Sequence, residues 1–187
     1  MFVALPWHYM PFSSSLPLQE KGYRAENKCL NFQKGVVEMS VDLAMEVRNR
    51  AGNYFREGYN CAESIFLAFR EVLAPDLNRD LVRLFTGFGG GLGYAGCICG
   101  ALTGSAAVLG LLAGRTDCQQ DRLRAYNLAK EFHDRFEGNF GATCCRLLNP
   151  HPFDSPEHLR NCLKITGNTA RLLMEFLLEK GLYGTRG

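Results

Sequence analysis

The chain has 187 residues, of which 47% are hydrophobic and 21% charged, the balance of a single globular domain with a sizeable core. The net charge is only +2, so the concentrated basic face of a nucleic-acid-binding protein is not expected. Eight cysteines and 20 glycines are the unusual features of the composition. A chain of this length does not need disulfide bonds for stability, so the cysteines are either core residues or part of the chemistry.

The first 38 residues show no sustained hydrophobic period of two or of 3.6 residues. Residues 1–20 contain no lysine or arginine, and three prolines interrupt their apolar runs, a pattern unlike that of a secretory signal peptide. We therefore predict an irregular N-terminal extension over residues 1–38 and one helical domain over residues 39–187. We also predict a cytoplasmic location, in which thiols stay reduced.

Helical periodicity begins directly after this extension. Ser40 is the predicted N-cap of a first helix, which ends at Gly58. A second helix follows Asn60, because Glu63 three residues later completes the pattern of a capping box. Pro75 ends this second helix, since proline cannot continue a helical hydrogen-bond ladder.

A short helical stretch over residues 78–85 leads into the most distinctive segment, residues 85–114, which has no charge and ten glycines. Residues 87–96 predict a loop, because repeated glycine does not hold a helix. Residues 97–114 predict a buried central helix. A transmembrane span is not expected, because the glycine-rich half would leave backbone polar groups unsatisfied in lipid.

The glycine loop contains a literal GxGxxG motif between Gly91 and Gly96. A dinucleotide-binding fingerprint must follow a strand and precede a helix, and it needs an acidic residue on a later strand. A phosphate-binding loop must end in Gly-Lys-Ser or Gly-Lys-Thr, and that ending is absent. We therefore do not expect nucleotide binding, and we predict that the loop leads backbone N–H groups toward the nearby cysteines.

Three further helical segments complete the chain. Residues 122–136 predict a helix whose buried stripe includes Leu123, Tyr126, Phe132 and Phe136, and residues 144–148 predict a short turn.

The last helix starts at the N-cap Ser155, with Pro156 in its first turn, and ends at Lys180-Gly181. No segment alternates at period two, so the predicted fold is all-α, a compact bundle of five to six helices with a Gly-rich loop leading into a buried central helix.

Most of the cysteines lie near predicted helix N-termini, where unpaired N–H groups favour a thiolate and lower the thiol pKa. Cys29 and Cys118 are interpreted as incidental. No CxxC or CxxCH spacing occurs, so zinc-ribbon, thioredoxin and c-type haem motifs are absent. His133, His151 and His158 are interpreted as surface or capping histidines rather than catalytic bases.

The order of motifs resembles a known family. Asn60-Cys61-Ala62-Glu63 opens a helix, GFGGGLG precedes Cys99-Gly100-Ala101-Leu102-Thr103-Gly104, and Cys145-Arg146-Leu147-Leu148 precedes a cysteine at 162. This pattern resembles the redox-active family named for its CGAxxG motif and four cysteines (C_GCAxxG_C_C), over residues 42–180. The resemblance implies that the family's four catalytic or metal-binding cysteines are Cys61, Cys99, Cys145 and Cys162.

The resemblance also suggests cofactors and partners. The family is similar to the non-haem part of split-Soret cytochromes, where cysteines hold an iron–sulfur cluster. The haem function does not carry over, because the haem-attachment motif is absent. Gly100 and Gly104 of the motif are candidate cofactor-binding residues, and Cys97 and Cys144 are candidate auxiliary ligands. Family members often lie near transporter genes, which implies a link to a membrane transporter.

Three hypotheses remain open from the sequence. The four thiols either hold an iron–sulfur cluster for electron transfer or cycle between dithiol and disulfide, and both roles require a redox partner that the sequence does not identify. Alternatively, they hold a structural zinc ion in a non-catalytic binding module. In the third hypothesis they are inert core cysteines. A GxxxG-like face at Gly96, Gly100 and Gly104 is also suited to packing between subunits, as in a homodimer.

Overall fold

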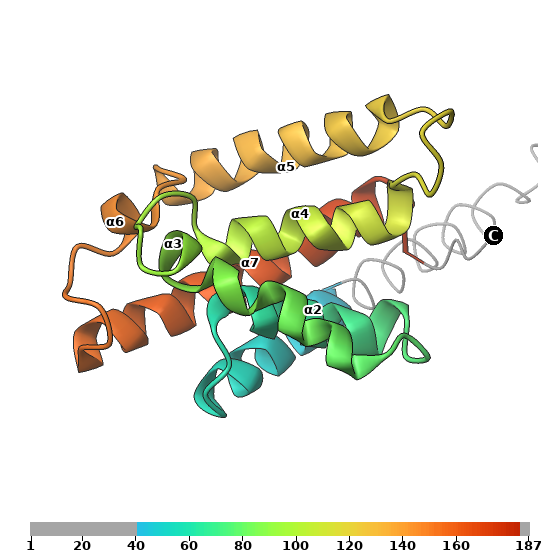
Figure 1. Cartoon of the computed structure of the whole chain (residues 1–187). Coiled ribbons are helices and arrows are strands. Elements are labelled where there is room, and N and C mark those ends of the chain that lie inside the picture. Colours follow the sequence, from blue (N-terminus) through green and yellow to red (C-terminus); the bar gives the residue numbers. More distant parts are fainter. Residues whose placement is uncertain (1–40, 184–187) are drawn as a thin grey trace, which may run out of the picture. The chain divides into compact units, whose positions relative to one another are not determined.

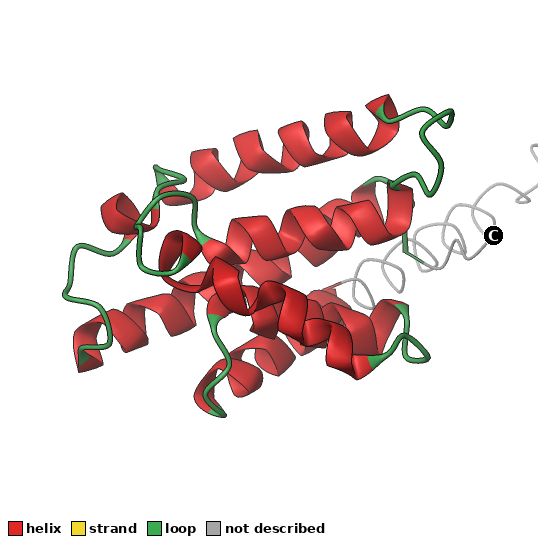
Figure 2. Ribbon diagram, in the orientation of Figure 1, coloured by secondary structure: helices red, strands yellow, loops and turns green. Residues whose placement is uncertain are grey.

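Helices make up the regular structure of residues 41–183, the part of the chain that the computed structural model describes, and no strand occurs among these residues (Figures 1 and 2). The all-α prediction is confirmed. The predicted extension over residues 1–38 and the predicted N-cap Ser40 lie outside the described residues. Within the described part of the chain, the helices fall short of the combination of length and apolar content that a bilayer crossing requires.

Local capping interactions set the first helix boundaries as predicted. Residues 41–56 are helical, and Gly58 follows with a left-handed φ of 105°. Helix α2 (Cys61–Leu73) begins with a complete capping box: the Asn60 side chain accepts from the N–H groups of Ala62 and Glu63, and Glu63 accepts from the Asn60 N–H group. A 3₁₀ helix, η1 (Arg79–Phe88), follows and continues beyond the predicted end at residue 85.

The remaining elements are α3 (Gly89–Leu92), α4 (Gly100–Ala113), α5 (Leu123–Phe140), α6 (Cys145–Leu148) and α7 (Pro156–Glu179). Ser155 accepts from the His158 N–H group and caps α7, and Pro156 occupies the first turn, as predicted. The predicted start of the central helix at residue 97 is wrong. Cys99 is the N-cap of α4, the two preceding residues are exposed, and Ile98 has a left-handed φ of 51°.

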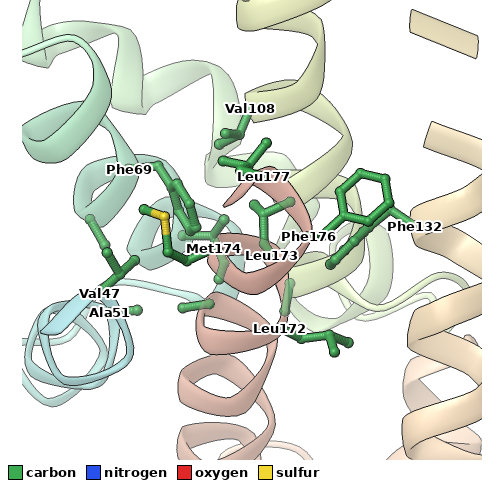
Figure 3. Close-up of a cluster of buried hydrophobic side chains, with 14 of the residues drawn as sticks. Val47, Ala51, Phe69, Val108, Phe132, Leu172, Leu173, Met174, Phe176 and Leu177 are labelled. Atoms are coloured by element: carbon green, nitrogen blue, oxygen red, sulfur yellow. The ribbon is translucent and has the colours of Figure 1, made fainter. Parts of the chain in front are cut away.

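Helix α4 occupies the middle of the bundle, because it packs against α2, α5 and α7 (Figure 1). Side chains of α7 fill the core between these helices. Figure 3 shows the labelled residues of this cluster: Val47, Ala51, Phe69, Val108, Phe132, Leu172, Leu173, Met174, Phe176 and Leu177. Phe132 of α5 and Phe176 of α7 meet with ring centroids 5.6 Å apart, which fastens α5 to the core.

The predicted buried stripe of α5 is only half correct. Phe132 and Phe136 are fully buried, but Leu123 and Tyr126 in the first turn are 57% and 61% exposed. The helix continues beyond its predicted end at residue 136 to Phe140 and stops where Gly141 adopts a left-handed φ of 81°.

Candidate functional site

Four cysteines from four separate helical segments line one internal cavity of about 20 Å³, here called the thiol cavity. Cys61 is the first residue of α2, Cys99 is the N-cap of α4, and Cys145 is the first residue of α6. Cys162 lies in the second turn of α7. The remaining lining residues are Gly90, Leu148, Asn149, Ile165 and Thr166. The structure thus brings together the four cysteines that the sequence singled out.

Backbone hydrogen bonds hold two of these cysteines side by side. The Cys99 N–H group donates to the Thr143 carbonyl at 2.8 Å, and the Arg146 N–H group donates to the Gly96 carbonyl at 3.1 Å. The Arg146 guanidinium also donates to the Ala95 carbonyl at 2.8 Å. The start of α4 and the start of α6 are therefore tied together directly beside Cys99 and Cys145.

The glycine-rich segment over the cavity is a left-handed turn rather than an ordinary loop. Residues 90–94 all have positive φ values, and the structure forms the short element α3 at this point. Only glycine adopts this backbone region without steric cost, which explains the composition of the segment. At Gly91 a Cβ atom would also come within 2.8 Å of the Cys145 Cβ, so the turn can lie close against the cavity.

The CGAxxG motif brings α4 close to the start of α2. A Cβ atom at Gly100 would lie 2.5 Å from the Cys61 Sγ and 2.7 Å from the Phe88 carbonyl oxygen. A Cβ atom at Gly104 would lie 3.0 Å from the Ala62 carbonyl oxygen. The structure therefore gives both glycines a packing function, and a direct contact with a cofactor stays a prediction for them.

Burial raises the pKa of all four cavity thiols above the ordinary 9.0. It raises the pKa of Cys99 to about 12 and that of Cys145 to about 11. It also raises the pKa of Cys162. It raises the pKa of Cys61 well above the ordinary value, and the charges of the other three thiolates add to that rise. The predicted lowering of these pKa values by helix N-termini is wrong, because loss of hydration outweighs the N–H donors.

Cys162 has two nitrogen atoms beside its sulfur. The Asn149 Nδ2 atom donates to the Cys162 Sγ at 3.2 Å and to the His158 carbonyl at 2.9 Å. The His158 Nε2 atom lies 3.4 Å from the same sulfur, and His158 is only 4% exposed. The interpretation of His158 as a surface or capping histidine is therefore wrong. The i, i+4 spacing of His158 and Cys162 was the sequence signal that could have revealed this contact.

Two buried polar atoms that line the cavity lack a hydrogen-bond partner among the described residues. They are the Asn149 Oδ1 and Thr166 Oγ1 atoms, and Asn149 and Thr166 are 3% and 0% exposed. Unsatisfied buried polar atoms are rare in native proteins and call for an explanation such as a bound group or water. As the structure stands, no three Cys, His, Asp or Glu side chains of residues 41–183 are arranged to ligate a single metal ion.

The other cysteines within residues 41–183 do not line the cavity. Cys97 and Cys118 are exposed, and Cys144 is half-buried beside Cys145. Cys29 lies outside the described residues. An auxiliary ligand role for Cys97 or Cys144 stays a prediction.

Comparisons with known proteins cover the part of the chain that carries these cysteines. A family model described as "Putative redox-active protein (C_GCAxxG_C_C)" matches residues 59–176, a stretch that contains all four cavity cysteines. A protein of Archaeoglobus fulgidus, described as "Uncharacterized protein", is 30% identical over 149 residues, covering 75% of this chain and 99% of that protein. No solved structure matches the chain.

Proposed function

The chain belongs to the C_GCAxxG_C_C redox-active family, and we propose that its four cavity cysteines bind an iron–sulfur cluster through which the protein transfers electrons. Four cysteine thiolates are the usual ligand set of [2Fe–2S] and [4Fe–4S] clusters, which supply one-electron transfer when bound. The convergence of Cys61, Cys99, Cys145 and Cys162 on one cavity is the observation that carries this proposal.

The electrostatics of the cavity favour a metal group over free thiols. Burial raises the pKa of the four thiols, and repulsion from neighbouring thiolates adds to the rise for Cys61, Cys99 and Cys145. Without a compensating charge the four thiols therefore stay protonated at neutral pH. A protonated thiol is a poor nucleophile, which weakens the dithiol alternative. Iron bound among the four sulfurs would offset the repulsion and deprotonate the thiols.

Hydrogen-bond donors around the sulfurs also support an iron–sulfur group. The backbone N–H groups of Ala62 and Ala101 oppose the rise in the pKa of Cys61 and of Cys99, respectively. The Asn149 side chain donates to Cys162, and the unpaired Thr166 hydroxyl lines the same cavity. Donors to the sulfurs stabilise the negative charge that such a group carries, and they tune its reduction potential.

The experiment is purification of the full chain under strictly anaerobic conditions, followed by its visible spectrum and measurement of iron, acid-labile sulfide and zinc. We expect a brown protein with iron and sulfide in equal amounts. Cys→Ala substitution at each cavity cysteine should lower the iron content, whereas the matched control Cys118→Ala, at an exposed cysteine outside the cavity, should leave it unchanged.

Three outcomes would contradict the proposal of an iron–sulfur cluster. Stoichiometric zinc without iron or sulfide would identify a structural zinc site, since zinc also binds four thiolates. A metal-free protein that forms disulfides between cavity cysteines on mild oxidation would identify dithiol chemistry. A metal-free protein whose cavity thiols react only after unfolding would identify inert core cysteines.

A further inference from the structure

A second and larger hollow lies directly beside the thiol cavity. This groove, here called the access groove, has a volume of about 700 Å³ and shares Cys61, Gly90 and Cys162 with the cavity. Its volume lies within the range of roughly 300–1,000 Å³ that is typical of small-molecule sites. Cys99 and Cys145 line only the cavity, so a molecule in the groove meets the thiols through Cys61 and Cys162.

The walls of the access groove are largely apolar. Helical residues 41–56 and the turn after them contribute Phe55 and Tyr59, the glycine turn contributes Tyr94, and α7 contributes Leu159 and Leu163. Tyr94 and Leu159 are 54% and 44% exposed although both are large and hydrophobic. A hollow with such walls fits a ligand with an apolar body.

The acidic side chains of the groove already have internal partners. Glu63 accepts the Asn60 N–H group at 2.9 Å and the Thr86 hydroxyl at 2.6 Å. Asp154 accepts the Tyr94 hydroxyl at 2.8 Å, a contact that ties the glycine turn to the loop before α7. Both carboxylates therefore hold wall residues of the groove in place through hydrogen bonds.

The two arginines of the groove differ in whether they have a carboxylate partner within residues 41–183. Arg160 pairs with Glu157 at 2.6 Å. Arg56 forms no ion pair within residues 41–183, and its guanidinium donates only to the neutral Asn53 side chain, at 2.8 Å. A guanidinium without a carboxylate partner suits a carboxylate, sulfonate or phosphate group of a ligand, because it can donate two parallel hydrogen bonds to it.

We propose that the access groove binds a small organic anion, with the negative group at Arg56 and the apolar body against the aromatic and leucine side chains next to Cys61 and Cys162. The ligand's role as a reactant of the thiol site rests on the proposed function. Its binding does not, because Arg56 and the groove walls are separate from the four thiols.

The binding experiment uses 8-anilinonaphthalene-1-sulfonate, a fluorescent molecule with an apolar aromatic body and one sulfonate, titrated into the full chain. We expect saturable binding at one site. Arg56→Gln should weaken this binding about tenfold, because a charge-assisted hydrogen bond is lost. The matched control Arg124→Gln removes the same charge from an exposed position of α5 outside the groove and should leave the affinity unchanged.

Two further measurements locate the probe and its charge. The uncharged analogue N-phenyl-1-naphthylamine should bind wild-type and Arg56→Gln protein equally well. Bound sulfonate probe should slow the alkylation of Cys162 and leave that of the exposed Cys118 unchanged. Equal probe affinities of the Arg56→Gln and Arg124→Gln proteins would disprove the anion site at Arg56. An alkylation rate of Cys162 that bound probe does not change would disprove binding in the access groove.

Both variants must keep the wild-type melting temperature, so that probe binding reports the folded groove. Iron content is measured on the same samples. A protein without iron that still shows Arg56-dependent binding would disprove the cluster and leave the groove proposal standing. A protein with iron but without saturable probe binding would disprove anion binding in the groove and leave the cluster proposal standing.

Discussion

The imidazole of His158 lies one helical turn before Cys162, with its Nε2 atom 3.4 Å from the Cys162 Sγ atom. Its Nδ1 atom is 3.2 Å from the carbonyl oxygen of His151. A carbonyl only accepts, so in the neutral ring Nδ1 carries the proton and Nε2 faces the sulfur as an acceptor. Phe153 packs edge-on against the same imidazole at a centroid distance of 5.0 Å, which holds the ring in place.

This contact predicts that His158 assists ionisation of Cys162. In the metal-free, reduced protein, His158→Phe should slow alkylation of Cys162 by iodoacetamide several-fold at neutral pH, because the sulfur loses its proton acceptor. Site-resolved mass spectrometry measures the rate, with the exposed Cys118 as internal reference. His133→Phe, at an exposed position of α5, is the control. Equal Cys162 rates in the two variants would contradict the role of His158.

A pair of glycine substitutions in α4 tests the close contact between α4 and Cys61. Gly100→Ala should destabilise the protein by about 1–3 kcal/mol, because the added Cβ would press on the Cys61 sulfur and the Phe88 carbonyl. Gly110→Ala in the same helix meets no atom within 4 Å and should be neutral or stabilise by up to about 1 kcal/mol. Urea unfolding measures both, and a stable Gly100→Ala protein with wild-type iron content would refute the contact.

Two threonine hydroxyls of α7 differ in their surroundings: one lines the thiol cavity, and the other donates to a carbonyl of its own helix. Thr166 Oγ1 has no partner among the described residues, whereas Thr169 Oγ1 donates to the Ile165 carbonyl at 2.7 Å. In the metal-free protein, Thr166→Val should be neutral or stabilising, and Thr169→Val should cost about 1 kcal/mol. Thermal unfolding measures both effects.

The same two variants should differ in the iron-loaded protein. Thr166→Val should lower the reduction potential, because a hydroxyl donor favours the more negative reduced state. Thr169→Val should leave the potential unchanged, since its hydroxyl does not line the cavity. Redox titration followed by visible absorbance measures the difference, and an equal shift in both variants would argue against a hydroxyl donor at the cavity.

The raised thiol pKa values predict a loss of stability in alkali. The pKa is about 12 for Cys99 and about 11 for Cys145 in the folded chain, against an ordinary 9.0. Between pH 9 and these values the unfolded chain releases protons that the folded chain retains, so the free energy of unfolding of the metal-free protein falls as pH rises. Well below pH 9 these thiols are protonated in both states and contribute no pH dependence.

Urea unfolding from pH 8 to 10.5 under reducing conditions measures this slope. A Cys99→Ser/Cys145→Ser double variant should show a shallower fall, because serine does not titrate in this window. The tyrosines with raised pKa values, Tyr54 and Tyr94, act in the same direction but are common to both proteins. Identical slopes would show that the two thiols are not desolvated in the folded chain.

Helix boundaries were predictable where they depend on neighbours three or four residues away. The Asn60–Glu63 capping box, the Ser155 N-cap and the left-handed Gly58 all occur as predicted. The start of α4 was missed, because the exposed Cys97 and Ile98 follow a left-handed glycine turn that the apolar pattern does not reveal.

The amino-acid sequence by itself determined the all-α class, the principal helix caps and, through the order of its motifs, the family and its four cysteines. Only the tertiary structure decided how these thiols behave. Their pKa values are raised, although N-terminal positions predicted the opposite, because segments distant in sequence exclude water and bring the sulfurs together. The unpaired Thr166 hydroxyl and the access groove likewise depend on packing between helices, which local sequence patterns do not encode.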